Sequence, residues 1–228
     1  MKTLYRCNRS GEGSGFRHKV PHELASLPLG LASLRRDVLI PQTTMDRPPI
    51  WFARKFDFTF PAEQHPNLCA RLRGTPARLE EIVRAAAPDI LIRKPNENGK
   101  WSAQEHAGHL LDLEPLWMAR TGDYVTGASQ LTVADLSNRQ TDEAQHNQRS
   151  IDEILAQFRS ARSRLVTSAE EIDPAIFGRV ILHPRLKTPL RLVDHLYFVA
   201  EHDDHHLAHI LGLTRPKAKG KKSGSDSD

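Results

Sequence analysis

Apolar side chains recur every three to four residues along four stretches of this chain, the spacing that places them on one face of an α-helix. Segments rich in proline, glycine and polar residues separate the stretches, and none shows a clear strand pattern. We therefore predict four long amphipathic helices, which cover about residues 75–87, 101–124, 150–172 and 189–213.

Local capping signals predict where these helices begin. Thr75-Pro76 and Thr188-Pro189 each place a capping hydroxyl before a proline, which is favoured in the first turn, so we expect a helix to start at each pair. Ser102 with Glu105 three residues later has the pattern of a capping box at the start of the second helix. Pro115 is expected to kink that helix.

These elements place the protein in the all-α class, as a four-helix bundle with long connections between its helices. The connection 126–147 is rich in polar side chains, including Arg139 and His146. A long connection in a compact domain is often functional, so these groups are candidates to line a pocket, although a solvated loop fits the pattern equally. The connection 175–189 adds Arg185 as a further basic candidate.

Composition divides the chain into a central domain and two flanks. Residues 1–44 are rich in glycine, serine and arginine and show no sustained hydrophobic period, so we expect an irregular or disordered extension. Met45 is a second candidate start, in which case that extension is an over-long gene assignment. Residues 45–214 carry the predicted bundle, preceded by an aromatic lead-in at 50–60, and residues 215–228 form a charged tail that we expect to be disordered.

The net charge of +4 belongs to the flanks. Residues 1–44 carry seven basic and three acidic residues, and residues 215–228 carry five and two, which leaves −3 for the central domain. A folded nucleic-acid binder usually carries its basic patch on the domain, so we expect no specific nucleic-acid binding. No apolar run approaches the ~20 residues that cross a bilayer. Cys7 and Cys69 suggest no disulfide framework, so we expect a cytoplasmic protein without membrane contact.

Five of the twelve histidines lie within residues 194–213, on the fourth predicted helix. Residues four apart share a helix face, so His202 with His206, and His205 with His209, can each project two imidazoles from neighbouring turns. Such a pair is half of a site for a divalent transition metal. The alternative is a histidine-rich helix whose rings form hydrogen bonds or face solvent.

A facing helix must supply the third ligand, because metal sites in bundles are built from side chains on neighbouring helices. The second predicted helix offers His106 or His109, and Asp112 lies one turn beyond His109, where it can support the ligand. Three neutral imidazoles with an open fourth position form a catalytic type of Zn²⁺ site, and Ni²⁺, Fe²⁺ and Mn²⁺ are further candidates.

Two motifs resemble those of the DinB-like superfamily, metal-binding four-helix bundles that include bacillithiol and mycothiol S-transferases. KWSAQEHAGHLLDLE at 100–114 is similar to that family's W-S-x-x-E-x-x-x-H-L pattern, and VAEHDDHHLAHI at 199–210 is similar to its E-H-D-x-H-H-L pattern. The resemblance spans about residues 50–213 and covers all four predicted helices. It implies a fold and a metal site, and it is not specific for one reaction.

Carried over residue by residue, the resemblance implies that the metal ligands are His109, His202 and His206, with no ligand role for His106, His205 and His209. The implied reaction is thiol transfer, in which the metal lowers the pKa of a low-molecular-weight thiol and the thiolate attacks an electrophile. The candidates for holding the carboxylate of a thiol cofactor or an anionic substrate are Arg139, Arg179, Arg185 and Lys187, and His146 is a further candidate to line the cofactor pocket.

Two other functions stay open at this point. One is a metal-dependent hydrolase that uses metal-bound water, for which the chain offers possible bases that spacing alone does not place: Glu105, Glu143, Asp203 and Asp204. The other is a non-catalytic, stress-related metal-binding bundle. The expected partners are a small-molecule thiol and an electrophile, with a homodimer as an open option, and no catalytic residue is assigned.

Overall fold

The computed structural model describes residues 48–95 and 100–215. The predicted extension at 1–44 and the tail after Arg215 lie outside the described residues, so both assignments stay predictions. None of the helices in the described part of the chain combines the length and the hydropathy that a bilayer-spanning segment needs.

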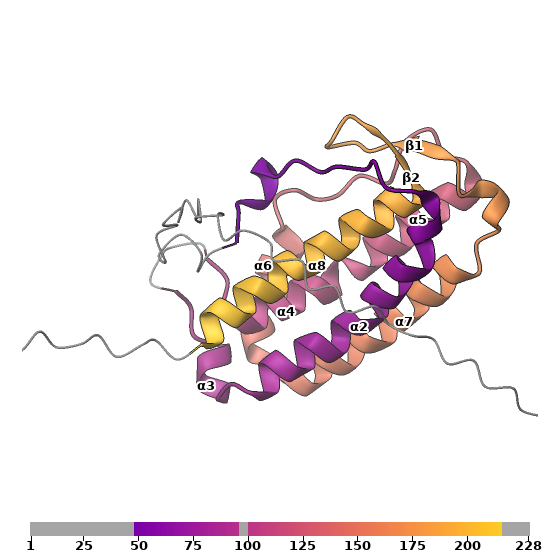
Figure 1. The fold of residues 1–228 in the computed structure, drawn as a ribbon. Helices are drawn as coiled ribbons and strands as arrows, with labels where there is room; N and C mark the ends of the chain where they lie inside the picture. Colours follow the sequence, from indigo (N-terminus) through magenta and orange to yellow (C-terminus); the bar gives the residue numbers. More distant parts are fainter. Residues whose placement is uncertain (1–47, 96–99, 216–228) are drawn as a thin grey trace, which may run out of the picture. The chain divides into compact units, whose positions relative to one another are not determined.

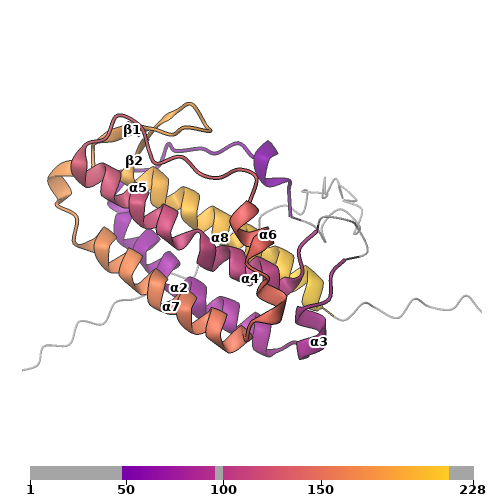
Figure 2. The same cartoon turned by 180° about the vertical axis from the view of Figure 1, so that it is seen from behind.

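Four helical columns make up the bundle. They are α2 (His65–Arg84), α4 (Ala103–Asp112) followed directly by α5 (Glu114–Thr126), α7 (Ile151–Glu170) and α8 (Leu192–Thr214). α8 packs against α2 and α4, and α7 packs against α2, α4 and α5, so each column has two neighbours (Figures 1 and 2). The predicted all-α four-helix bundle is therefore confirmed, and the kink expected near Pro115 is the junction between α4 and α5.

Short elements fill the connections between the columns. The two strands pair antiparallel, with Ile181 opposite Leu190, and form a hairpin that no clear strand pattern in the sequence had indicated. The short elements are η1 (Trp51–Ala53), η2 (Ala62–Gln64), α3 (Pro88–Leu91), α6 (Arg139–Glu143), η3 (His146–Gln148), η4 (Pro174–Ile176), β1 (Val180–Leu182) and β2 (Pro189–Arg191).

Neither Thr-Pro pair begins a helix. α2 starts at His65, ten residues before Thr75, and Pro189 leads into β2 while α8 starts at Leu192. Arg191 and Asp194 form the cap of α8, with the Asp194 carboxylate accepting from the Arg191 backbone N–H. The capping box of Ser102 and Glu105, by contrast, is present at the start of α4.

Pro76 lies inside α2, where a proline removes one backbone hydrogen bond. The carbonyl that loses its partner is that of Leu72, four residues earlier. The Arg162 guanidinium reaches across from α7 and donates to this carbonyl at 3.5 Å. The Thr75 hydroxyl, rather than capping a helix, donates to the Asp203 carboxylate of α8 at 2.8 Å. Contacts between helices therefore override the local sequence pattern of Thr75-Pro76, which on its own favours a helix start.

The core consists of two apolar clusters with a polar layer between them. One cluster contains Leu72, Trp117, Leu165 and Val199, and the other contains Leu79, Leu110, Phe158 and Leu207. Along each column, the residue between the two clusters is polar: Thr75 in α2, Glu114 in α5, Arg162 in α7 and Asp203 in α8.

Arg162 joins this polar layer together. Its guanidinium donates to Glu114 Oε1 at 2.6 Å and, through both terminal nitrogens, to the Asp203 carboxylate. All three side chains are almost fully buried. Leaving one buried charge without its partner typically costs about 3–5 kcal/mol, so the layer strongly disfavours any other register of the four columns.

Candidate functional site

Three histidines from two helices converge beside the polar layer. His109 comes from α4, and His202 and His206 come from neighbouring turns of α8. One ring nitrogen of each lies within 4.8 Å of the other two, and the Nε2 atoms of His202 and His206 are 3.1 Å apart. All three rings are buried. The structure thus brings together the three residues that the sequence singles out as ligands.

A chain of hydrogen bonds orients His109. The Asp112 carboxylate can only accept, so the Thr141 hydroxyl donates to it at 2.9 Å and in turn accepts from His109 Nδ1 at 2.9 Å. His146 Nε2 donates to the same carboxylate at 2.8 Å. With its proton on Nδ1, His109 keeps the lone pair of Nε2 free. Asp112 therefore supports His109 as expected from the sequence, but through Thr141.

His106 plays the corresponding part for His206. Their Nδ1 atoms are 2.9 Å apart, so one ring donates and the other accepts. When His206 is the donor, its Nε2 lone pair is free to face His202. The His106 ring also stacks on His209, with centroids 4.9 Å apart and planes 9° apart. His106 thus contacts the three-histidine set and, like the three histidines, lines the cavity described below.

Burial keeps these rings neutral. It holds the pKa of His202 and of His206 well below the usual range, and the positive charges that neighbouring histidines would carry lower both further. The pKa of His109 is lowered to about 4, mainly by burial, while the nearby Asp112 charge opposes the shift. Neutral imidazole is the form that binds metal, so the site is ready for a ligand role at neutral pH.

The three histidines lie on the wall of a cavity of about 570 Å³. Most of the wall is aromatic or apolar and includes Trp51, Phe52, Trp101, Trp117 and Phe198. His205 and His209 line the cavity too, but they do not belong to the three-nitrogen set. A wall of this composition suits a ligand with an apolar body.

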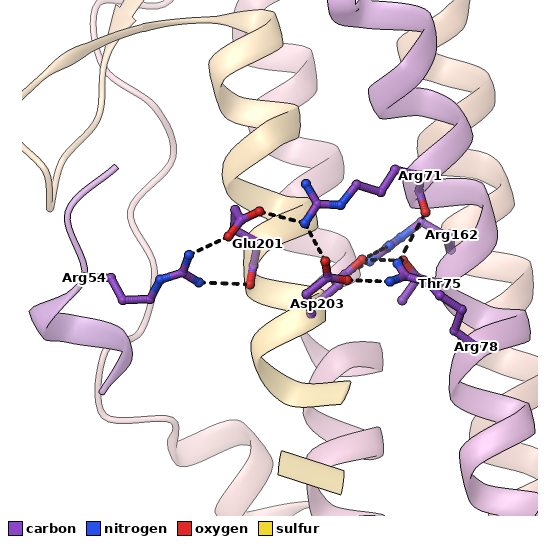
Figure 3. Close-up of polar contacts among 8 residues, drawn as sticks. Arg54, Arg71, Thr75, Arg78, Arg162, Glu201 and Asp203 are labelled. Atoms are coloured by element: carbon purple, nitrogen blue, oxygen red, sulfur yellow. Dashed lines mark hydrogen bonds and ion pairs between the residues drawn. The ribbon is translucent and has the colours of Figure 1, made fainter. Parts of the chain in front are cut away.

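The segment around η1 forms the roof of this cavity, and ion pairs on the outside of α8 hold it there. The Trp51 ring lies 5.0 Å from the His202 ring between centroids. Glu201, the residue before His202, bridges Arg54 of the η1 segment and Arg71 of α2, at 2.5 and 2.7 Å. Figure 3 shows Glu201 between these two guanidinium groups, with Asp203 turned toward Thr75 and Arg162.

Arg139, His146 and Arg185, three of the candidates for binding a thiol or anionic substrate, lie in different surroundings. Arg185 lines the cavity. Arg139 is exposed, lies 4.0 Å from the Glu143 carboxylate, and does not line the cavity. His146 is fully buried behind His109, with its ring against Gly108, and does not line the cavity either. In this geometry His146 supports a candidate ligand through Asp112, and it does not contact the contents of the cavity.

The four carboxylates considered as bases also lie away from the cavity wall. Glu105 is engaged in the capping box, Glu143 is on the surface, and Asp203 and Asp204 pair with arginines of neighbouring helices. The cavity is lined instead by Asp135 and Asp142. Sequence reasoning also missed Arg120 and His183, which line the cavity and are both almost fully buried.

Comparison with known proteins agrees with the fold. Residues 71–210 match the family described as the DinB superfamily. No curated protein matches the sequence. Among solved structures, the chain is similar to YfiT from Bacillus subtilis, described as a probable metal-dependent hydrolase with an unusual four-helix bundle topology. The TM-score is 0.61 at 22% identity, covering 70% of this chain and 91% of YfiT.

A second similar structure is the mycothiol-dependent maleylpyruvate isomerase. Here the TM-score is 0.52 at 12% identity, covering 65% of this chain and 60% of the isomerase. At these identities the two likenesses establish the fold alone. The chemistry has to be argued from the residues of the site.

Proposed function

This chain belongs to the DinB superfamily, and we propose that it is a metal-dependent enzyme that holds one divalent ion with His109, His202 and His206. The observation that carries the proposal is the convergence of three buried, neutral imidazoles on the wall of an aromatic cavity. One ring nitrogen of each histidine lies within 4.8 Å of the other two, which is the grouping that a single ion requires.

The donor set fits a divalent transition metal. Nitrogens bound to tetrahedral zinc at about 2.0–2.1 Å are about 3.3 Å apart, and the His202 and His206 Nε2 atoms are 3.1 Å apart. The hydrogen bonds of His109 and His206 occupy Nδ1 and leave Nε2 free. Three histidines with a fourth position toward the cavity suit Zn²⁺, and Ni²⁺, Fe²⁺ and Mn²⁺ are compatible with the same ligands.

For the reaction we propose transfer of a low-molecular-weight thiol to an electrophile. A divalent ion held here lowers the pKa of a coordinated thiol, which makes thiolate available at neutral pH. The aromatic walls receive the apolar part of the electrophile. Trp101 contributes on the α4 side, where its ring lies 4.6 Å from the His109 ring between centroids.

A hydrolase is the second candidate, and one observation favours it. Asp142 lines the cavity and accepts a hydrogen bond from Trp101 Nε1 at 2.8 Å, so a carboxylate lies near the histidines and could accept a proton from water. YfiT, the similar protein described as a probable hydrolase, adds a precedent within the fold. We favour thiol transfer because a thiol needs no strong general base once its pKa is lowered.

The metal site is tested by zinc stoichiometry in single alanine variants of the full chain. We expect about one zinc per chain, and loss of binding in His109→Ala, His202→Ala and His206→Ala. His205→Ala and His209→Ala are the matched controls, since both rings lie on the same helix and line the same cavity. Equal zinc retention in all five variants would rule out the three-ligand site.

The reaction is tested separately, with zinc-loaded protein and an epoxide or alkyl chloride in the presence and absence of a thiol panel. Thiol-dependent product that disappears in His109→Ala supports transfer. The hydrolase is supported if the protein hydrolyses the electrophile at the same rate with and without thiol, and if Asp142→Asn abolishes this hydrolysis. No turnover under either condition at full zinc occupancy supports a non-catalytic binding protein.

A further inference from the structure

The cavity has a basic end that the metal proposal does not use. Arg120 of α5 lines it with 2% of its surface exposed, and His183 lines it with 1% exposed. Arg185 follows in the turn between β1 and β2. No carboxylate pairs with either arginine among the described residues. Burial lowers the pKa of Arg120, and the Asp123 charge opposes this shift without forming an ion pair with the guanidinium, whereas no such charge acts on Arg185 within the described part of the chain. Two guanidinium groups without an ion-paired carboxylate in a largely apolar cavity are unusual, because buried charges are normally paired.

Hydrogen-bond donors outnumber acceptors at this end. The backbone N–H groups of Arg185 and Leu186 approach His183 Nδ1 at 3.2 and 3.1 Å, and Arg120 Nη1 approaches His183 Nε2 at 3.2 Å. A neutral imidazole has one acceptor nitrogen, so three donors on its two nitrogens cannot all be satisfied. If Nδ1 accepts the backbone groups, Nε2 carries a proton and faces the Arg120 donor.

Arg185 adds a further donor without an acceptor. Its Nη2 is buried and has no hydrogen-bond partner within the described ranges. The guanidinium lies over the aromatic rings of Phe52 and Phe198, at 5.3 and 5.5 Å from their centroids. Burial lowers the pKa of both arginines, to about 10 for Arg120, so both stay charged at neutral pH.

Among the described residues, none of the titratable groups on the cavity wall supplies a further acceptor or a negative charge to these donors. Burial, followed by the charges of Arg120 and Arg185, lowers the pKa of His183 to about 3, so its ring adds no charge. The two carboxylates on the cavity wall are engaged elsewhere. Asp135 accepts from the Ser137 hydroxyl and Asp142 accepts from Trp101. A ligand that supplies two acceptor oxygens and a negative charge matches this end of the cavity.

We infer that Arg120, His183 and Arg185 form a subsite for a carboxylate group of the molecule that reacts at the three histidines. The part of this inference that links the carboxylate to a reaction at the three histidines rests on the proposed function. Phe198, under the Arg185 guanidinium, precedes His202 by four residues on α8, which is about 6 Å along the helix axis. The favoured ligand therefore has a carboxylate and a reacting atom separated by a short apolar or aromatic body.

Binding of benzoate to the full chain tests the subsite directly, with benzamide as the neutral analogue of the same shape. Calorimetric titrations are run on zinc-loaded protein and after addition of a chelator. We expect benzoate to bind more tightly than benzamide by about tenfold or more under both conditions, since a charge-assisted pair at a buried site has that strength. Equal binding of the two compounds would overturn the inference.

Substitutions separate this subsite from the metal. Arg185→Met keeps the apolar stem over the rings and removes the donors, so it should abolish the preference for benzoate. Arg185→Lys, which keeps the charge, should retain part of it. Arg93→Met removes an exposed arginine paired with Asp89 and should change nothing. Benzoate binding that is unaffected by Arg185→Met, or that requires zinc, would show that the carboxylate binds elsewhere.

The carboxylate can belong to the thiol or to the electrophile, and kinetics distinguishes the two. 3-Mercaptopropionate is compared with its amide, and 4-(chloromethyl)benzoate with its amide. Arg185→Met should raise KM about tenfold for the carboxylate form of one partner only, and that partner occupies the subsite. An equal effect on acids and amides would contradict the inference. Failure of the metal proposal is separately visible as absent zinc, and it leaves the benzoate titration interpretable.

Discussion

Gly108 of α4 is the position where one added methyl group should disturb the histidine site most selectively. A Cβ at this residue would lie 2.2–2.4 Å from three atoms of the His146 ring. That ring is fully buried, its Nε2 donates to Asp112, and the His146 backbone carbonyl accepts from Gln104 at 2.6 Å. Since carbon atoms pack at about 3.5–4.0 Å, the ring must move by more than about 1 Å in Gly108→Ala.

The expected change in stability follows from three effects of the substitution. Alanine is favoured over glycine by about 1 kcal/mol inside a helix. Overpacking a tight core contact costs about 1–3 kcal/mol, and a lost hydrogen bond to a charged group costs about 1.5–3 kcal/mol. The net expectation for Gly108→Ala is a loss of about 1.5–5 kcal/mol in the free energy of unfolding. Gly122 of α5 has nothing within 4 Å of an added Cβ, so Gly122→Ala should gain about 1 kcal/mol.

Urea unfolding of the metal-free variants, followed by helical circular dichroism, measures both values. The matched pair removes the contribution of helix propensity, because both glycines lie inside helices of the same column. If the metal proposal holds, Gly108→Ala should also weaken zinc binding about 10–100-fold, the usual effect of disturbing the partner of a ligand. If Gly108→Ala and Gly122→Ala stabilised the protein equally, the close approach of the His146 ring to Gly108 would be contradicted.

Two further predictions concern the polar layer and the buried histidines. Asp203→Ala leaves Arg162 buried with half of its partners, and urea unfolding should show a loss of about 3–5 kcal/mol. Thr75→Val removes only the hydroxyl that donates to Asp203 and accepts from Arg78, and it should cost about 1.5–3 kcal/mol. Burial lowers the pKa of nine of the described histidines, so below about pH 6.5 the unfolded chain binds protons that the folded chain does not. Above about pH 6.5, the titration of these histidines therefore leaves the free energy of unfolding unchanged. As the pH falls from there toward about 4, the free energy of unfolding decreases by about 1.4 kcal/mol per pH unit for each histidine. The raised pKa of Glu114, about 7, opposes this with a single group. A urea midpoint that stays constant between pH 7 and 4.5 in chelator would contradict the burial of these rings.

The helices and the pair of His202 and His206 could be predicted because both follow from spacing along one helix, whereas spacing left His106 and His109 open and only the resemblance to the DinB-like superfamily favoured His109. A period of 3.6 residues identifies the buried face of each column, and a separation of four residues places His202 and His206 on neighbouring turns. The capping box at Ser102 is equally local, since both of its residues lie within one turn. Such features depend on nothing outside the segment, and the structure has them where the sequence indicates.

The Thr-Pro pairs show where local signals fail. Thr75 and Pro76 have the composition of a helix start, but the hydroxyl finds a buried carboxylate on α8, and Arg162 of α7 donates to the carbonyl that the proline leaves free. Both partners lie far away in the sequence, so no local pattern contains them. The same holds for Thr141 and His146, whose link to His109 runs through Asp112 and depends on how the connection 126–147 folds back on α4.

The segment from Glu201 to His206 shows that the spacing of the histidines does not by itself determine the geometry of this site. Glu201 pairs with arginines of the η1 segment and α2, which places the Trp51 roof, and Asp203 binds Arg162 in the core. These charged neighbours prevent α8 from rotating or sliding, because either motion would leave a buried charge unpaired. The imidazoles at 202 and 206 thereby face α4 and the cavity. A helix with the same histidines and alanine at 201 and 203 would keep the spacing of the motif and lose the contacts that hold its rings against His109.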